Sequence, residues 1–330
     1  MTEETSRMFI TGPAVVKASM HETVSSEDLG GARMHATKSG VVHFVYEDDE
    51  ATLLGVRDLL SYLPQNNEEE PPFVQTEPVD GSDAIEDIVP ENMRMAYDVR
   101  DVIDTFVDRD TFLEVQPWFA QNVVVGFARL DGYTIGIVAN QPSVSAGTLD
   151  IDTSDKAARF IRFCDCFNIP LMTLVDVPGY MPGSAQEHGG IIRHGAKILF
   201  AYSEATVPKV SLIMRKAYGG AYIAMNSKQM GADLVYAWPI AQIAVMGPEG
   251  AVDILYKNKL KNAEDPKTER TRLIEEYEKK HLNPYIGAAN GYIDDVIAPE
   301  DTRTVISNAF DSLRKKREKN PWKKHGNIPL

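Results

Sequence analysis

Two stretches of the chain repeat the same order of strand, glycine turn and helix, and this repeat constrains the fold more than any other feature. The apolar run 169–174 is followed by a turn that contains Gly179, and then by a helix-like stretch at 191–200. The apolar run 210–214 is followed by Gly219–Gly220 and a second helix-like stretch. Such repeated units are typical of an α/β domain whose loops gather at one edge of a sheet.

The glycine pair Gly219–Gly220 has the features of an anion-binding site made from backbone groups. Glycine lets the main chain approach a ligand closely and accepts a positive φ. The first N–H groups of a helix have no partner within the helix and lie at its positive end. Such donors can hold an enolate or a ureido oxygen. An isolated glycine pair more often only packs a helix against a sheet, so the second glycine turn is what favours a site here.

The remaining apolar pattern predicts further elements and a division of the chain. The runs 40–46, 123–129 and 134–139 predict strands, and 50–60 predicts an amphipathic helix. The segment 65–92 is rich in charge, amide side chains and proline, so we expect a linker there. The predicted divisions are residues 1–64, 65–92 and 93–330.

Charge and hydropathy exclude several classes of function. The net charge is −14, from 34 basic and 48 acidic side chains, so the chain lacks the general positive charge of a protein that binds nucleic acid or anionic lipid. No stretch approaches the roughly 18 apolar residues of a membrane span, and the first residues lack a signal-peptide pattern. We therefore expect a cytoplasmic protein without a membrane span.

The two cysteines do not predict a metal or redox site. Cys164 and Cys166 are separated by one residue, which is not a metal-ligand or redox spacing. Their aromatic neighbours instead predict two buried thiols that only pack. We expect no bound metal.

Longer blocks of sequence carry a resemblance along nearly the whole chain. In addition to the two glycine turns, these blocks are Met8–Pro13, Leu29–Ala32, Leu59–Pro64, Tyr97–Arg100, Gly136–Pro142, Ala244–Ala251 and Lys323–Leu330. They resemble the carboxyltransferase subunits of biotin-dependent acyl-CoA carboxylases, and most closely the propionyl-CoA carboxylase β-chain, transcarboxylase and the methylmalonyl-CoA decarboxylase α-chain. The resemblance implies the crotonase-like (ClpP/crotonase) spiral, an α/β fold that the apolar pattern alone does not reveal.

The resemblance also assigns the divisions of the chain. Family members carry two homologous halves, so residues 1–64 resemble a remnant of the N-terminal carboxyltransferase domain and 93–330 a complete C-terminal one. In the family a glycine-rich segment that meets the acyl-CoA thioester precedes the block that begins at Met8. Our hypothesis is that a separate polypeptide supplies that half; the alternative, that this half has been removed from the chain, stays open.

The chemistry implied by the resemblance is carboxyl transfer between carboxybiotin and a short-chain acyl-CoA, either propionyl-CoA or methylmalonyl-CoA. Biotin, attached to a separate carrier protein or domain, brings the reactive group, so the protein has to orient the reactants and stabilise oxyanions. The implied partners are a biotin carboxyl carrier protein, a biotin carboxylase and further copies of the chain in a hexamer. Two alternatives stay open: a methylmalonyl-CoA decarboxylase α-chain, and a non-catalytic scaffold or carrier-docking subunit.

The resemblance assigns site residues position by position. It places the catalytic oxyanion hole for biotin on the backbone N–H groups of Gly220 and Ala221. The predicted biotin-binding residues are Gly179, Gly189, Gly190, His194, Tyr218 and Gly219. The predicted acyl-CoA-binding residues are Asn140, Gln141, Pro142, Tyr222 and Ile223.

Three of the surrounding residues call for an interpretation of their own. Several propionyl-specific members have Asp at the position of Ile223, so the isoleucine leaves the acyl length open. His194 has no carboxylate partner nearby in sequence, and we expect a structural or pocket role for it instead of general-base catalysis. Asp176 in the first glycine turn is predicted to orient a loop or accept a backbone N–H.

Overall fold

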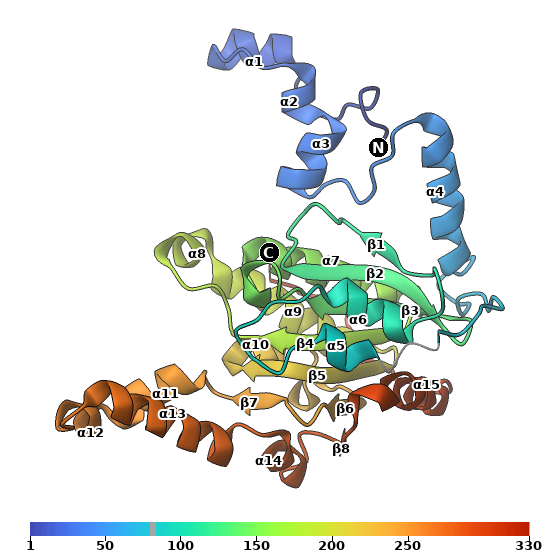
Figure 1. Ribbon diagram of the computed structural model, residues 1–330. Helices are drawn as coiled ribbons and strands as arrows, with labels where there is room; N and C mark the ends of the chain where they lie inside the picture. Colours follow the sequence, from blue (N-terminus) through green and yellow to red (C-terminus); the bar gives the residue numbers. More distant parts are fainter. Residues whose placement is uncertain (80–83, 330) are drawn as a thin grey trace.

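A mixed β-sheet forms the centre of the molecule (Figure 1), whose computed structural model describes residues 1–79 and 84–329. The strand order is β1-β2-β3-β4-β5-β6-β8, and β7 pairs with the end of β5. The first three strands are antiparallel and the pairings from β3 to β8 are parallel. The strands are β1 Leu113–Val115, β2 Val123–Leu130, β3 Tyr133–Asn140, β4 Leu171–Val177, β5 Lys209–Tyr218, β6 Leu234–Ala237, β7 Gln242–Ala244 and β8 Asp295–Val296.

Helices cover both faces of this sheet. One apolar cluster lies between the sheet and α7 (Ile151–Cys166), α9 (Ile191–Glu204) and α10 (Gly219–Ala224). The other lies between the sheet and α5 (Ile85–Ile88), α6 (Val99–Phe106) and α15 (Thr302–Leu313). Because both faces are covered, strands β2 and β4 are buried along their whole length and read as continuous apolar runs.

Smaller helices lie outside this core, and one group forms an arm that extends away from the sheet (Figure 1). The arm contains α11 (Pro248–Leu255), α12 (Lys257–Lys261), α13 (Pro266–His281) and α14 (Pro284–Ala289). The N-terminal helices are α1 (Pro13–Met20), α2 (Ser26–Gly30), α3 (Ala32–Met34), the π-helix η1 (His35–Ser39) and α4 (Asp49–Tyr62). The remaining helices are α8 (Ser184–Gly189) and the short 3₁₀-helices η3 (Ser145–Gly147), η4 (Lys228–Met230) and η5 (Pro299–Asp301).

The structure confirms most predicted elements and corrects one. The runs 123–129 and 134–139 are strands, and 50–60 lies within α4. The predicted strand at 40–46 is wrong, because this segment pairs with the N-terminus and not with a neighbouring strand. The amino group of Met1 donates to the carbonyl of Phe44, and the N–H of Tyr46 donates to the carbonyl of Met1. An apolar run without a partner strand cannot form a ladder.

The predicted linker at 65–92 is mostly irregular but takes part in the core. Residues 80–83 lie outside the described residues. Ile85, at the start of α5, is fully buried in the cluster under α6 and α15. Among the described helices, none is long and apolar enough to cross a membrane.

Candidate functional site

The turn between β5 and α10 carries the predicted oxyanion donors. Gly219 has a φ of +61°, and a Cβ atom built there would lie 2.9 Å from the carbonyl oxygen of Val245. This position therefore requires glycine for its backbone angle and for its close contact. A Cβ atom built on Gly220 meets no described protein atom within 4 Å. The backbone at Gly220 thus borders open space, and the N–H groups of Gly220 and Ala221 have no acceptor within α10.

Two tyrosines lie on either side of these donors, and both are buried. The Tyr218 hydroxyl donates to the side-chain oxygen of Gln242, and burial raises the pKa of Tyr218. Burial also raises the pKa of Tyr222 to about 12. Both phenols therefore stay neutral near pH 7, and of the two it is the Tyr218 hydroxyl that donates a hydrogen bond here. Among the described residues, the buried Tyr222 hydroxyl has no hydrogen-bond partner.

His194 does have a carboxylate partner, which lies far away in the sequence. Its Nδ1 atom is 2.9 Å from both carboxylate oxygens of Asp155, and Lys197 Nζ is 2.6 Å from Oδ1 of the same carboxylate. Asp155 is on α7 and His194 is on α9, and the two helices pack side by side. The sequence does contain one signal for a shared partner of His194 and Lys197. Their spacing puts both side chains on one face of the predicted helix.

The glycines predicted to bind biotin lie in the loops that lead into α9. Gly189 ends α8, and Gly190 is the N-cap of α9, with a φ of +92° and a carbonyl that accepts the N–H of His194. Gly179 lies in the loop after β4, where its carbonyl accepts the N–H of Leu149. Helix α9 packs against α10, so the structure brings these loops and the Gly220 turn to one side of the sheet. Their contact with biotin stays a prediction.

Four of the five residues predicted to contact acyl-CoA are buried, and three of these four lie at the end of β3 or in the loop after it. The Asn140 amide donates to the carbonyl of Gly147 at 3.1 Å. The Gln141 amide donates to Asp98 at 2.6 Å, and its oxygen accepts the N–H of Val99 at 3.1 Å. These side chains, with the buried Pro142, organise the loop after β3. Any contact of this loop with acyl-CoA would be made by its backbone or its neighbours, and stays a prediction, as it does for Tyr222 and the half-buried Ile223.

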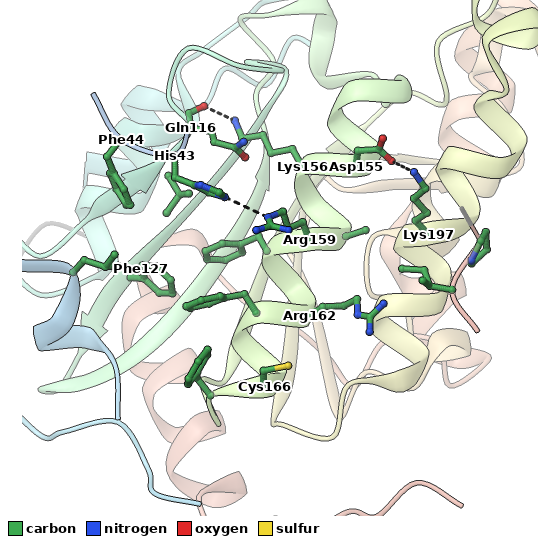
Figure 2. Close-up of a pocket in the computed structure, with 18 residues that line it drawn as sticks. His43, Phe44, Gln116, Phe127, Asp155, Lys156, Arg159, Arg162, Cys166 and Lys197 are labelled. Atoms are coloured by element: carbon green, nitrogen blue, oxygen red, sulfur yellow. Dashed lines mark hydrogen bonds and ion pairs between the residues drawn. The ribbon is translucent and has the colours of Figure 1, made fainter. Parts of the chain in front are cut away.

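A cavity of about 750 Å³ lies along the outer face of α7 (Figure 2). Its walls combine phenylalanine rings with several charged side chains, and none of the predicted site residues lines it. Asp155 connects the two regions, since it lines the cavity and also binds His194. The aromatic residues that line the cavity are Phe44, Phe127, Phe160, Phe163 and Phe167.

The same cavity corrects the expectation for the cysteines. Cys166 is exposed and lines the cavity, because it lies on the outward face of α7. Cys164 lies on the inward face, where it is fully buried, and burial raises the pKa of its thiol well above the usual range. Among the described residues, no group of three or more His, Cys, Asp or Glu side chains is placed to hold a metal ion.

Lys156, at the edge of this cavity, is almost completely buried and has no carboxylate partner within salt-bridge distance among the described residues (Figure 2). Its ammonium group donates to the carbonyls of Gln116, Phe119 and Val123 at 3.0, 2.8 and 2.7 Å. It therefore fixes the loop between β1 and β2. Burial lowers the pKa of Lys156 to about 8, from its ordinary value of 10.5.

This burial gives a testable pH dependence. Between about pH 8 and 10.5 the unfolded chain keeps a proton that the folded chain has lost, so unfolding takes up a proton and stability rises with pH. We expect the free energy of unfolding of the wild type, relative to Lys156→Met, to increase by up to about 3 kcal/mol across this range. Urea unfolding at several pH values measures this difference. A difference that stays flat from pH 7 to 10 would contradict the lowered pKa.

Comparisons with known proteins agree with one another. The sequence profile described as "Carboxyl transferase domain" matches residues 1–328. The chain is 56% identical over 332 residues to a propionyl-CoA carboxylase, carboxyltransferase subunit of Haloferax mediterranei, covering 100% of this chain and 64% of that protein. It is 53% identical over 334 residues to methylmalonyl-CoA decarboxylase subunit alpha of Propionigenium modestum, with the same coverage of 100% and 64%.

A solved structure extends the likeness to three dimensions. The crystal structure of transcarboxylase 12S with methylmalonyl-coenzyme A and methylmalonic acid bound matches with a TM-score of 0.95 and 53% identity. The match covers 100% of this chain and 64% of that one. The chain therefore spans just under two thirds of the length of these relatives. The likeness confirms the fold that the sequence resemblance implied.

Proposed function

We propose, from the premise that this chain belongs to the carboxyl transferase domain family, that it takes part in moving a carboxyl group between carboxybiotin and a short-chain acyl-CoA. The observation that carries the proposal is the turn at Gly220, where free backbone donors border open space. Relatives at 56%, 54% and 53% identity are named as a carboxylase, a carboxyltransferase and a decarboxylase. Carboxyl transfer to or from an acyl-CoA is the step that these names share.

The residues of the turn fit a ureido group such as that of biotin. The open space at Gly220 admits a ligand next to the main chain. The N–H groups of Gly220 and Ala221 are neutral donors that could give hydrogen bonds to an anionic oxygen. The unpartnered Tyr222 hydroxyl is one further donor at the same helix. When bound, biotin would supply the carboxyl carrier and the nitrogen base.

The protein's own contribution is then orientation and electrostatic stabilisation. No free carboxylate or imidazole is required at the turn, and His194 is already held by Asp155 and Lys197. Backbone donors fixed by the fold need no reorganisation as charge develops, which is why they stabilise an oxyanion effectively. The same donors serve carboxyl transfer in either direction.

The proposal includes partners and a division of the chain. A biotin carboxyl carrier protein would present biotin, and a biotin carboxylase would recharge it. A homo-oligomer is supported by the hexamer assembly named for transcarboxylase 12S. Residues 1–64 would be part of the N-terminal carboxyltransferase domain and 93–330 the C-terminal one.

The test is a carboxyl-transfer assay with a radiolabelled carboxyl group. The protein, isolated together with the polypeptides that accompany it in its own cells, is incubated with biotin and with methylmalonyl-CoA labelled in its free carboxyl. Chromatography follows the passage of the label to biotin and the formation of unlabelled propionyl-CoA. We expect propionyl-CoA to form only when biotin is present. Saturation-transfer NMR with free biotin is measured in parallel. Absence of both turnover and biotin binding would refute the proposal.

A further inference from the structure

Strand β5 contains a bulge shortly before the Gly220 turn. Its register with β4 runs evenly up to the pair Val175 and Ile213, but the next pair is Val177 and Ala217. A single residue of β4, Asp176, thus faces three residues of β5. Bulges bend a strand and change where its end points, and they are common next to active sites.

The Asp176 carboxylate fills this bulge. One oxygen accepts the backbone N–H of Lys216 at 3.1 Å, which confirms the expectation that Asp176 accepts a backbone N–H. The other oxygen accepts from Nε of Arg215 at 2.8 Å and from the Tyr97 hydroxyl at 3.1 Å. Asp176 and Arg215 are both completely buried. The N–H of the bulge residue Lys216 therefore donates to a side chain on the β4 side, while Lys216 is in register with Gln242 of β7 on the other side.

The two basic residues of the bulge hold an irregular segment, 90–95, against the sheet. Arg215 donates to the carbonyls of Pro90, Asn92 and Met95 at 3.1, 3.2 and 3.0 Å. The Lys216 ammonium donates to a fourth carbonyl of this segment at 3.2 Å. These side chains give the carbonyls of the segment the hydrogen bonds that a neighbouring strand would otherwise provide.

The segment also reaches the arm that borders the turn. The guanidinium of Arg94 lies 2.9 Å from the carboxylate of Glu249, near the start of α11. Just before α11 lies Val245, whose carbonyl would contact any Cβ at Gly219. The bulge thus supports the Gly219–Gly220 turn along the strand and through this segment.

We propose that Asp176 is a positioning residue for the Gly220 and Ala221 donors, because its carboxylate holds the β5 bulge and so fixes where β5 ends and α10 begins. This inference rests on the proposed function for its effect on rate. None of the hydrogen bonds that Asp176 makes among the described residues reaches the turn, so its carboxylate would act through the N–H of Lys216. Since small displacements of reacting groups are costly, loss of this contact would slow the reaction more than it weakens substrate binding.

Two double variants separate the acceptor from the charge. Asp176→Asn with Arg215→Met removes both buried charges but keeps an oxygen that can accept the Lys216 N–H. Asp176→Leu with Arg215→Met removes the charges and the acceptor. The two proteins differ only at position 176, where asparagine and leucine have similar volumes. If the leucine variant does not fold, Asp176→Ala in the same background replaces it.

Both variants lack Arg215, so they are compared with each other. We expect kcat of the leucine variant to be about 100-fold below that of the asparagine variant, with the same KM for methylmalonyl-CoA in both. Equal kcat values for the two variants would overturn the inference, whether both are active or both are inactive. Hydrogen exchange of the 216–221 amides is a second readout that does not need turnover. It is expected to be faster only in the variant without the acceptor.

The two readouts keep this inference apart from the proposed function. A wild type that neither turns over nor binds biotin refutes the function, while slow exchange in the asparagine variant and fast exchange in the leucine variant would still support the role of Asp176 in holding the bulge. Equal exchange in the two variants would refute that role even if the wild type is fully active.

Discussion

Replacing Gly220 with valine is expected to lower the rate of carboxyl transfer at least about 100-fold while the protein stays folded. The Cβ atom of the new side chain would meet no described protein atom within 4 Å, so the valine occupies space that the fold leaves open. The φ of Gly220 is not in the left-handed region, so an L-residue is accepted there. The loss therefore comes from blocking access of the ligand oxygen to the donors. The carboxyl-transfer assay and a thermal unfolding measurement together check this result.

Gly250 offers a matched control. Like Gly220, it lies in the first turn of a helix without a positive φ, and its nearest neighbour to a built Cβ is the Met246 sulfur at 3.7 Å. We expect Gly250→Val to keep the wild-type rate within about 3-fold, because Gly250 is exposed and carries none of the predicted oxyanion donors. If Gly220→Val were as active as the wild type, the turn would not be the place where the reaction occurs.

Replacing Arg215 alone with methionine is expected to destabilise the protein by about 3–5 kcal/mol, because the buried Asp176 carboxylate would lose its close partner and keep only the Lys216 ammonium at 3.7 Å as a cationic partner. Three carbonyls of segment 90–95 would lose their donor in the same change. Urea or thermal unfolding of the two proteins at neutral pH measures the difference. Added Asp176→Asn is expected to restore part of the lost stability, since it removes the buried carboxylate charge that Arg215 had balanced.

An exposed arginine provides the comparison. Arg272 on α13 pairs with Glu269 one turn earlier, and its side chain is 45% exposed. Such surface pairs contribute about 0–1 kcal/mol, so Arg272→Met should change the free energy of unfolding by no more than that. If Arg215→Met lowered the free energy of unfolding by no more than Arg272→Met does, water or another donor would have replaced the guanidinium of Arg215.

The central strands could be predicted because burial on both faces leaves a strong pattern. Strands β2 to β5 are long and apolar, and the glycines at 219 and 220 mark the turn after β5. The spiral fold came from the resemblance, since several topologies share such a pattern. The same reasoning failed at 40–46, where apolar residues have no strand to pair with and bond to the N-terminus instead.

Contacts between distant residues were beyond the sequence. The Asp155 partner of His194 is 39 residues away, and only the packing of α7 on α9 brings them together. Arg215 is a charged residue in a strand of mostly apolar residues, and it is fully buried. Nothing in the neighbouring sequence indicates that Asp176 is its ion-pair partner. Cys166 was expected to be buried because its neighbours are aromatic, but their rings line a cavity.

The two glycines of the turn are constrained for different reasons. The constraint at Gly219 comes from the fold, and the constraint at Gly220 would come from the activity. Gly219 is held by its backbone angle and by Val245, so any relative that keeps this turn has to keep a residue that tolerates a positive φ there. A Cβ atom built on Gly220 meets no described protein atom within 4 Å, so under the proposed function only the ligand beside it would restrict this position. Members of the lineage that have drifted into purely structural roles should therefore retain the first glycine and accumulate side chains at the second.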